Sequence, residues 1–328
     1  MKLADCTTLG LGGPARAWIT AATEGELTEA VRKAGRDEPV LILGGGSNLV
    51  VADEGFPGTV IQVATRGLAI DGDTVTVAAG EPWDPVVERT LAAGLPGLEC
   101  LSGIPGLAGA TPIQNVGAYG SEVSDTIVGV RVFDRETLKT SFVRNGKCGF
   151  AYRTSVFRGD DRYVILDVTF RLGVPAPVRY AELSAAASGA GRAGGDPTPA
   201  EVRNAVLALR RRKGMVIDPA DPDTRSAGSF FTNPVVPADQ APDGAPRYDA
   251  GPGLVKIPAA WLIEHAGFAR GYAAPGGARI STKHTLALVN DGGTTAALLA
   301  LAREIRDRVK ATYHIDLHPE PLLLGTTL

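Results

Sequence analysis

The stretch "LILGGGSNL" at residues 41–49 decides how the chain begins to fold. Its apolar part extends back to Pro39 and is a short continuous run, typical of a strand buried on both faces. Upstream, residues 23–35 read "TEGELTEAVRKAG", where Thr23 and Glu26 form a capping box and apolar residues recur at helical spacing. A helix, a buried strand and a glycine turn in this order predict an α/β opening.

The turn itself is a candidate anion site. Gly44, Gly45 and Gly46 follow the strand directly, and Ser47 and Asn48 come next. Glycines have no Cβ, so successive backbone amides can converge on a phosphate, and the two polar side chains add further groups. The pattern matches neither common phosphate-loop motif. A tight turn without a ligand therefore explains it equally well.

Further along, the chain predicts a mixture of strands and helices. Strands are expected at 74–80, 127–133, 140–143 and 162–172, with a helix near 83–93, which together indicate an α+β second domain. Capping signals and apolar periodicity predict helices at 198–214, 258–267 and 294–313, and alternation in "HIDLH" predicts a terminal strand running to Pro319.

A second glycine-rich stretch, "SGIPGLAGATPIQNVGAYG" at 102–120, has few bulky side chains. Such a segment cannot build its own core, so we expect its small residues to press against a flat group that is not protein. A poorly ordered loop is the alternative. With the first turn, this loop suggests a nucleotide-type cofactor, and its candidate binding residues are Ser102, Gly103, Ile104, Pro105, Gly109, Ala110, Thr111, Asn115, Gly117 and Ala118.

Composition excludes several classes of protein. The 328 residues are 44% hydrophobic and 21% charged, which is ordinary for a soluble globular chain of two or three domains. A net charge of −3 leaves no basic footprint for nucleic acid, and no apolar run approaches the ~18–20 residues of a membrane span. Three scattered cysteines, Cys6, Cys100 and Cys148, fit neither a disulfide framework nor a zinc motif and indicate the cytoplasm.

Two single residues invite a chemical interpretation. Ser229 in "SAGSFFTNP" lies between Gly228 and two phenylalanines, where a hydroxyl is either bonded to its own turn or kept in a dry pocket for chemistry. Arg153 lies among aromatic residues in "FAYRTSVFR" and needs an anionic partner, which is either a ligand carboxylate or a structural one.

A metal site is the main rival. If "HIDLH" is a strand, then His314, Asp316 and His318 share one face and could hold a metal ion, with Glu320 as a base. A solvated strand face explains the same pattern, so no metal is assigned.

Five blocks together carry a resemblance. "LILGGGSNLVVADEGFPGTVI", "SGIPGLAGATPIQNVGAYG", "CGFAYRTSVFR", "SAGSFFTNP" and "HPE", in this order and over essentially the whole chain, closely resemble the UDP-N-acetylenolpyruvoylglucosamine reductase family, flavoenzymes of peptidoglycan precursor synthesis.

The resemblance implies a fold and two cofactors. FAD would be bound by a fold of the vanillyl-alcohol-oxidase type in two subdomains, at 1–66 and 67–214, with the terminal strand at 315–328 returning to the first. An α/β domain at 215–314 would hold the substrate, and NADPH would supply hydride. A cytoplasmic monomer acting on small molecules is expected.

The resemblance also implies roles for individual residues. Arg153, Ser229 and Glu320 fall on the catalytic positions: the arginine and a protonated Glu320 would stabilise the enolate formed by hydride addition, and the serine would deliver a proton to carbon, shielded from water by the phenylalanines. The implied substrate contacts are Tyr180 in the tyrosine-loop motif "VRYAEL", Lys213, Asn233 and Lys256.

Three alternatives to the reductase remain. A flavin oxidase of the same fold would use oxygen and would need no protonation of carbon. A hydrolase would use the metal array at His314, Asp316 and His318, and an idle nucleotide-sugar module would bind without turnover.

Overall fold

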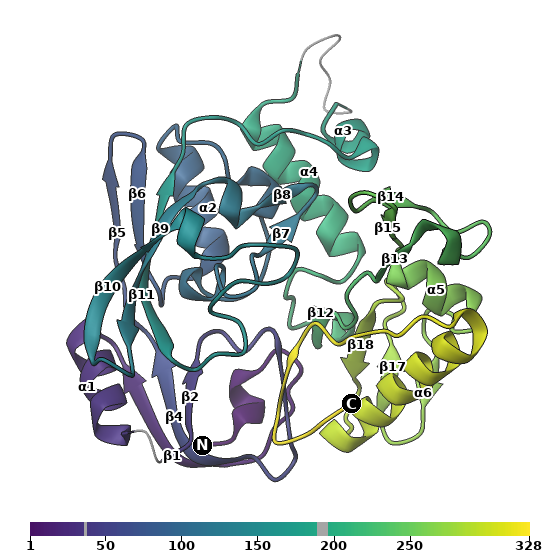
Figure 1. Cartoon of the computed structure of the whole chain (residues 1–328), viewed down its shortest axis with the longest axis horizontal. Coiled ribbons are helices and arrows are strands. Elements are labelled where there is room, and N and C mark those ends of the chain that lie inside the picture. Colours follow the sequence, from purple (N-terminus) through teal and green to yellow (C-terminus); the bar gives the residue numbers. More distant parts are fainter. Residues whose placement is uncertain (36–37, 189–195) are drawn as a thin grey trace. The chain divides into compact units, whose positions relative to one another are not determined.

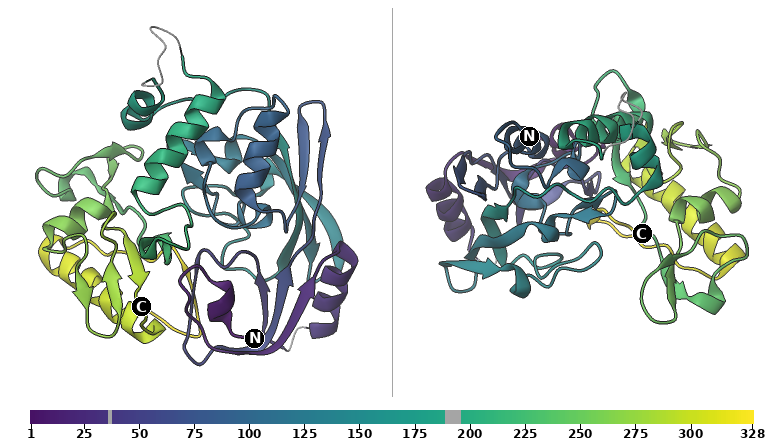
Figure 2. Two further views of the ribbon diagram at one scale, coloured as in Figure 1. Left: turned by 180° about the vertical axis from the view of Figure 1, so that it is seen from behind. Right: turned by 90° about the horizontal axis from the view of Figure 1, so that it is seen from above.

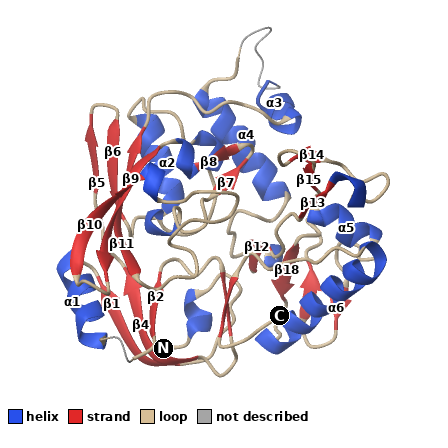
Figure 3. Ribbon diagram, viewed as in Figure 1, coloured by secondary structure: helices blue, strands red, loops and turns tan. Residues whose placement is uncertain are grey.

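The computed structural model describes residues 1–35, 38–188 and 196–328, and the chain divides into two compact units (Figure 1). The first unit consists of residues 1–15, 46–56 and 213–328, and the second of residues 16–45 and 57–212. Helices and strands occur throughout both (Figure 3). The three-domain division at residues 66 and 214 stays a prediction.

The second unit is built on two main sheets. Five antiparallel strands follow the order β10-β9-β11-β6-β5, and a three-stranded sheet follows the order β1-β4-β2, in which β2 and β4 run parallel. The strands are β1 (Ala15–Ala21), β2 (Val40–Leu43), β4 (Phe56–Val63), β5 (Leu68–Asp71), β6 (Thr74–Ala78), β9 (Ile127–Asp134), β10 (Lys139–Arg144) and β11 (Tyr163–Arg171), with a small hairpin of β7 (Gly117–Ala118) and β8 (Ser121–Glu122).

Four helices complete this unit: α1 (Glu24–Ala34), α2 (Trp83–Ala92), α3 (Ala181–Ser188) and α4 (Pro199–Arg212). The capping box of Thr23 and Glu26 is present at the start of α1, and α2 packs Trp83 against Phe170 of β11 with ring centroids 5.8 Å apart. The helices predicted at 23–35, 83–93 and 198–214 are confirmed, as are the strands predicted at 74–80, 127–133, 140–143 and 162–172.

The first unit has its own core. A four-stranded antiparallel sheet follows the order β12-β18-β17-β16, and α6 packs along β17 and β18 with its buried stripe (Figure 2). The elements are β3 (Leu49–Val51), β12 (Ser226–Ser229), β13 (Val235–Pro237), β14 (Tyr248–Asp249), β15 (Leu254–Lys256), α5 (Ala259–His265), β16 (Ala273–Ala274), β17 (Ala278–Ile280), β18 (Ala287–Asn290), α6 (Thr295–Tyr313) and β19 (Leu322–Leu324).

The predicted terminal strand running to Pro319 is wrong. His314 caps α6 in the left-handed conformation, and the strand β19 begins only after Pro321, where it pairs in parallel with β3. The alternation reflects burial instead, because Ile315 and Leu317 are buried while their neighbours are exposed.

The strand on which the metal alternative rested is therefore absent. Asp316 instead pairs with Lys310 of α6, with Oδ1 2.8 Å from Nζ. Across residues 1–35, 38–188 and 196–328, no group of three or more His, Cys, Asp or Glu side chains could hold a metal ion. In the same residues no helix is long and apolar enough to cross a membrane.

Candidate active site

The first unit brings the predicted proton donor and the predicted carboxylate together through backbone pairing. The amide of Glu320 donates to the carbonyl of Phe230 at 2.9 Å, and Thr232 donates to the carbonyl of His318 at 3.0 Å. Residues 230–232 therefore lie beside residues 318–320. Ser229 directly precedes this paired segment, so two predicted catalytic residues are neighbours in the fold.

Asn48 joins the same cluster. Its side-chain Nδ2 donates to the carbonyl of Glu320 at 3.3 Å, and the amide of Leu322 donates to the carbonyl of Asn48 at 3.0 Å. The predicted glycine turn thus ends against the segment that carries Glu320.

Ser229 ends β12 opposite Ala287 of β18. Gly228 before it has φ +70°, which a residue with a side chain adopts only with strain. Phe230 and Phe231 after it are each 1% exposed, and their rings meet edge to face at 5.1 Å. The Ser229 hydroxyl makes no hydrogen bond to its own turn within the described part of the first unit, which argues against the simple turn interpretation.

Three predicted substrate residues also lie in the first unit. Asn233 accepts a 2.9 Å hydrogen bond from the amide of Ala259, the first residue of α5, so its side-chain oxygen already stabilises a helix start. Lys256 ends β15 opposite Val235, and Lys213 directly follows α4. Their roles toward a substrate stay predictions.

In the second unit the two glycine-rich stretches pack against each other. A Cβ on Gly45 would lie 2.9 Å from the Cα of Gly106, closer than real contacts allow, and a Cβ on Gly44 would touch Leu107 and Ala110. Any side chain at position 45 would push the loops apart. The remaining residues of the first turn, Gly46, Ser47 and Asn48, belong to the first unit.

The loop at 102–118 is folded rather than poorly ordered, and its candidate residues divide into a buried group and a half-buried group. The buried ones are bonded within the protein: Ser102 donates to the carbonyl of Glu99, Thr111 to that of Ala108, and the amide of Gly103 to Asp84. Gly109 and Asn115 are likewise buried and bonded to protein. The half-buried candidates are Ile104, Pro105, Ala110, Gly117 and Ala118.

Arg153 lies against this loop. Its Nη2 donates to the carbonyl of Gly117 at 2.9 Å, and its guanidinium lies 5.2 Å from the centre of the Tyr152 ring. The backbone at Arg153 has φ +54°, a strained conformation for a non-glycine residue and one often found at functional sites. The side chain of Asn115 in the loop also donates a hydrogen bond to the carbonyl of Ala151 at 3.2 Å, which holds the segment that carries Arg153 against the loop.

Tyr180 is half-exposed at the start of α3, and its ring meets that of Tyr119 edge to face at 6.2 Å. Arg179 donates to the carbonyl of Gly120 at 3.0 Å. The predicted tyrosine loop therefore packs on the end of the 102–120 stretch, within the same unit.

Four further residues near these segments were not predicted from the sequence. Tyr119 contacts Tyr180. Buried Glu99 accepts 2.6 Å hydrogen bonds from the amides of Gly97 and Ala176. Arg210 of α4 is so deeply buried that desolvation lowers its pKa to about 10. In the first unit, Asp223 forms an ion pair with Arg279. Tyr119 lies inside the loop already singled out and Arg210 in the basic end of the predicted helix at 198–214, whereas Glu99 and Asp223 carried no local signal.

Comparison with known protein families gives two matches. Residues 219–324 match the model of the UDP-N-acetylenolpyruvoylglucosamine reductase C-terminal domain, and residues 15–137 match that of an FAD binding domain. The catalytic candidates Ser229 and Glu320 fall within the first match, and the glycine turn and the loop at 102–118 fall within the second.

Curated relatives match the chain over nearly its full length. The chain is 55% identical to UDP-N-acetylenolpyruvoylglucosamine reductase of Thermobifida fusca, covering 100% of this chain and 98% of that one. It is 53% identical to the reductase of Saccharopolyspora erythraea, with 99% and 95% covered.

A solved structure agrees as well. The crystal structure of UDP-N-acetylenolpyruvylglucosamine reductase from Thermus caldophilus matches with a TM-score of 0.69 at 27% identity, covering 99% of this chain and 98% of that one. Together with the FAD binding domain match, this confirms the predicted fold class. The chain belongs to the UDP-N-acetylenolpyruvoylglucosamine reductase family.

Proposed function

We propose that this protein reduces UDP-N-acetylglucosamine enolpyruvate to UDP-N-acetylmuramate with NADPH and bound FAD, in peptidoglycan precursor synthesis. The observation that carries the proposal is the backbone pairing of residues 230–232 with 318–320, which makes Ser229 and Glu320 neighbours in a chain of this family. A proton donor and a carboxylate held together suit a reaction that adds a hydride and a proton to a carbon–carbon double bond.

The residues present fit FAD. Residues 15–137 match an FAD binding domain, and the close approach of Gly45 to Gly106 brings the backbones of the two loops together. The half-buried small residues Ala110, Gly117 and Ala118 would lie against the cofactor. FAD bound there would supply the hydride chemistry that links NADPH to the terminal carbon of the enolpyruvyl group.

Ser229 delivers the proton in this proposal. Hydride addition breaks the π bond and moves its electron pair to the carbon beside the carboxylate, which is then basic enough to take a proton from a hydroxyl. The Ser229 hydroxyl is not engaged in its own turn, Ser229 is half-buried, and the two buried phenylalanines that follow it would help to keep water away once substrate is bound. The serine is then the positioned donor.

Arg153 and Glu320 would stabilise the negative charge that develops on the substrate before protonation. The guanidinium of Arg153, fixed by its bond to the Gly117 carbonyl, would neutralise the substrate carboxylate. Glu320 in its protonated form would donate a hydrogen bond to the enolate, and the anchoring of its backbone by Phe230 and Asn48 would hold it in place.

The nucleotide part of the substrate would be bound by two lysines, a tyrosine and an asparagine. Tyr180, Lys213, Asn233 and Lys256 are proposed to contact the diphosphate and uridine, with the lysines neutralising phosphate charge. The three cysteines are free thiols, which supports action in the reducing cytoplasm. A monomeric state stays a prediction.

The test is steady-state oxidation of NADPH by the purified protein with the enolpyruvyl UDP-sugar present or absent. We expect NADPH consumption to require the sugar and to yield UDP-N-acetylmuramate in equal amount, in air and without it. Consumption that requires oxygen and forms hydrogen peroxide at the same rate without the sugar would contradict the proposal in favour of an oxidase.

A further inference from the structure

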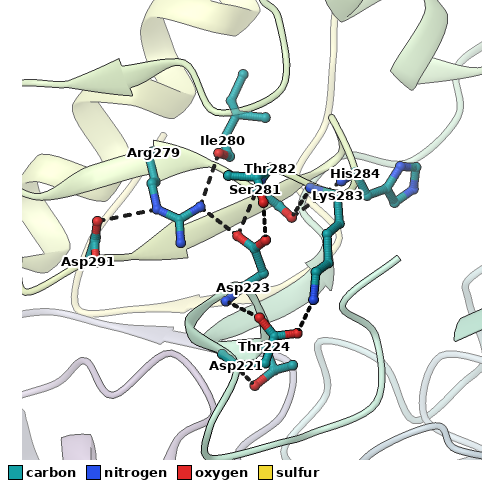
Figure 4. A network of polar contacts seen from close by, with 10 residues as sticks. All are labelled: Asp221, Asp223, Thr224, Arg279, Ile280, Ser281, Thr282, Lys283, His284 and Asp291. Carbon is teal, nitrogen blue, oxygen red and sulfur yellow. Dashed lines mark hydrogen bonds and ion pairs between the residues drawn. The ribbon is translucent and has the colours of Figure 1, made fainter. Parts of the chain in front are cut away.

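A buried carboxylate ties the residues just before the Ser229 strand to the connection between β17 and β18. Asp223 is 3% exposed and lies in the short 3-10 helix Pro222–Thr224. Its Oδ1 accepts from Arg279 Nη1 at 2.5 Å and from the amide of Thr282 at 3.2 Å, and its Oδ2 accepts from the Thr282 hydroxyl at 2.5 Å (Figure 4). One carboxylate thus joins two stretches distant in sequence.

Neighbouring contacts reinforce the same junction. Lys283 pairs with Asp221 at 2.5 Å, and Asp221 also accepts from the amide of Asp223 at 3.1 Å. Arg279 reaches Asp291 through Nε at 3.3 Å. Burial alone would raise the pKa of Asp223, but hydrogen bonds from Thr282 and Arg279 outweigh it and lower that pKa. The carboxylate is therefore ionised and satisfied at neutral pH.

Both stretches lead directly to Ser229. β12 begins three residues after Asp223 and ends at Ser229. The other stretch continues into β18, where Ala287 lies opposite Ser229 and the carbonyl of Leu286 accepts a 2.8 Å hydrogen bond from the amide of Phe230. Ser281, next to Thr282, donates from its amide to the carbonyl of Ala287 at 2.8 Å. Thr282 and Ser229 are thus connected through two residues, Ser281 and Ala287.

The pairing of β12 with β18 leaves the position of Ser229 dependent on such support. Ser226 faces Val289 and Ser229 faces Ala287, so three steps on one strand oppose two on the other. A bulge of this kind interrupts the ladder and redirects a side chain. Gly228 at its centre has φ +70° and no side chain that could pack. The Asp223 contacts join the two stretches that lead into the bulge, one through β12 and the other through the connection to β18.

We propose that Asp223, with Arg279 and Thr282, is a positioning unit that holds the bulged Ser229 strand in place for proton delivery to the substrate. The inference rests on the proposed role of Ser229. Hydride addition becomes irreversible only once carbon is protonated, so slower protonation also slows net recolouring of the flavin by the substrate. A displacement of about 1 Å of a reacting group can cost about 100-fold in rate, so loosening the junction should slow protonation and recolouring while leaving reduction of the flavin by NADPH nearly intact.

The test compares Asp223→Asn and Thr282→Val with Thr282→Ser in the FAD-loaded, full-length protein. The asparagine removes the negative charge that Arg279 binds and one of the two carboxylate oxygens that accept hydrogen bonds from Arg279 and Thr282. Valine removes only the hydroxyl that binds Asp223, whereas serine keeps it. Anaerobically, one measures the rate of flavin bleaching by NADPH and the rate of recolouring by the enolpyruvyl UDP-sugar, each in H₂O and in D₂O.

Asp223→Asn and Thr282→Val are expected to recolour about 10- to 100-fold more slowly than wild type, with bleaching within about twofold and a larger solvent isotope effect on recolouring. Thr282→Ser is expected to behave like wild type. An equal loss in both steps, or no loss in either, would overturn the inference. If Asp223→Asn does not fold, the comparison of Thr282→Val with Thr282→Ser by itself tests the inference.

Ser229→Ala, measured alongside, separates two kinds of failure. If it recolours slowly while Asp223→Asn and Thr282→Val recolour at the wild-type rate, the positioning unit is refuted and the role of Ser229 stands. If Ser229→Ala recolours at the wild-type rate, the serine is not the proton donor, and the inference falls with it.

Discussion

Glu320 and Ser229 are held together by a 2.9 Å hydrogen bond from the amide of Glu320 to the carbonyl of Phe230, the residue after Ser229. The contact joins the end of β12 to the segment that follows α6, and the bridge between Phe231 and Pro319 extends it. Because the pairing uses backbone groups, it positions the two side chains without engaging either.

Replacing Ser229 with alanine separates the two halves of the reaction. We expect NADPH to bleach the flavin at the wild-type rate, because that step needs no proton from the serine. Reduction of the enolpyruvyl sugar is expected to fall by about 10²- to 10⁴-fold, the usual contribution of a positioned acid. The control is Ser141→Ala on the exposed strand β10. Equal rates of sugar reduction in the two variants would rule Ser229 out as the donor.

Asn233 is expected to stabilise the fold whatever its role toward a substrate. Its side-chain oxygen accepts the hydrogen bond from the first amide of α5, so Asn233→Ala should lower the free energy of unfolding by about 1 kcal/mol. Asn233→Asp keeps the acceptor and should lose much less. Chemical denaturation of the three proteins measures the difference. An equal loss in both variants would show that the capping contact is not what stabilises the fold.

An ion pair between half-exposed Arg162 and buried Asp134 in the second unit predicts a pH dependence of stability. The side-chain hydrogen bond from Arg162 is the main cause that lowers the pKa of Asp134 from 3.8 to about 2, and the amides of Glu136 and Thr137 add to it. A carboxyl group whose pKa is lowered in the folded state stabilises the protein above its unfolded value, and this contribution disappears as the pH falls through the folded value.

The free energies of unfolding of wild type and Asp134→Asn should therefore differ by a constant amount above about pH 4.5 and converge between about pH 4 and 2. Denaturation curves across this range measure it, with Asp71→Asn at an exposed position as the control. A gap that persists unchanged to the lowest pH would mean that the pair does not shift the titration of Asp134.

The thiols should differ in reactivity. Burial raises the pKa of Cys148 to about 11, so at pH 8 only about one thiol in a thousand is the reactive thiolate. Cys100 is also buried, and burial raises its pKa too, whereas Cys6 is partly exposed. Iodoacetamide followed by mass spectrometry should label Cys6 alone in the native protein. Cys6→Ser should take up no label until denaturant is added, and native labelling of Cys148 would contradict the burial.

The elements that the sequence predicted well are those with local causes. The capping boxes of Thr23 with Glu26 and of Thr198 with Glu201 both form, so the starts of α1 and α4 could be placed from a few residues. The terminal strand failed because alternation in "HIDLH" reports burial of Ile315 and Leu317, whereas a strand also needs a partner. That partner, β3, is available only from Leu322 onward.

The candidate site could be proposed residue by residue from the sequence, and these roles stay predictions, but its contacts could not. The glycine loops, Arg153, Ser229 and Glu320 were recognisable from motifs, since each lies in a short block of unusual composition. The Asp223–Arg279 contact was not, because it joins two ordinary polar residues across a sheet and neither has a local signature. The packing of Gly45 on Gly106 likewise depends on tertiary structure.

The most direct test of the central claim is the anaerobic visible spectrum of the purified protein, recorded alone, after NADPH and again after the enolpyruvyl UDP-sugar. The proposed function predicts a flavin spectrum that NADPH bleaches and that the sugar restores without oxygen. A flavin that bleaches but recovers only when air is admitted would contradict the reductase, as would a protein that remains colourless after FAD is added.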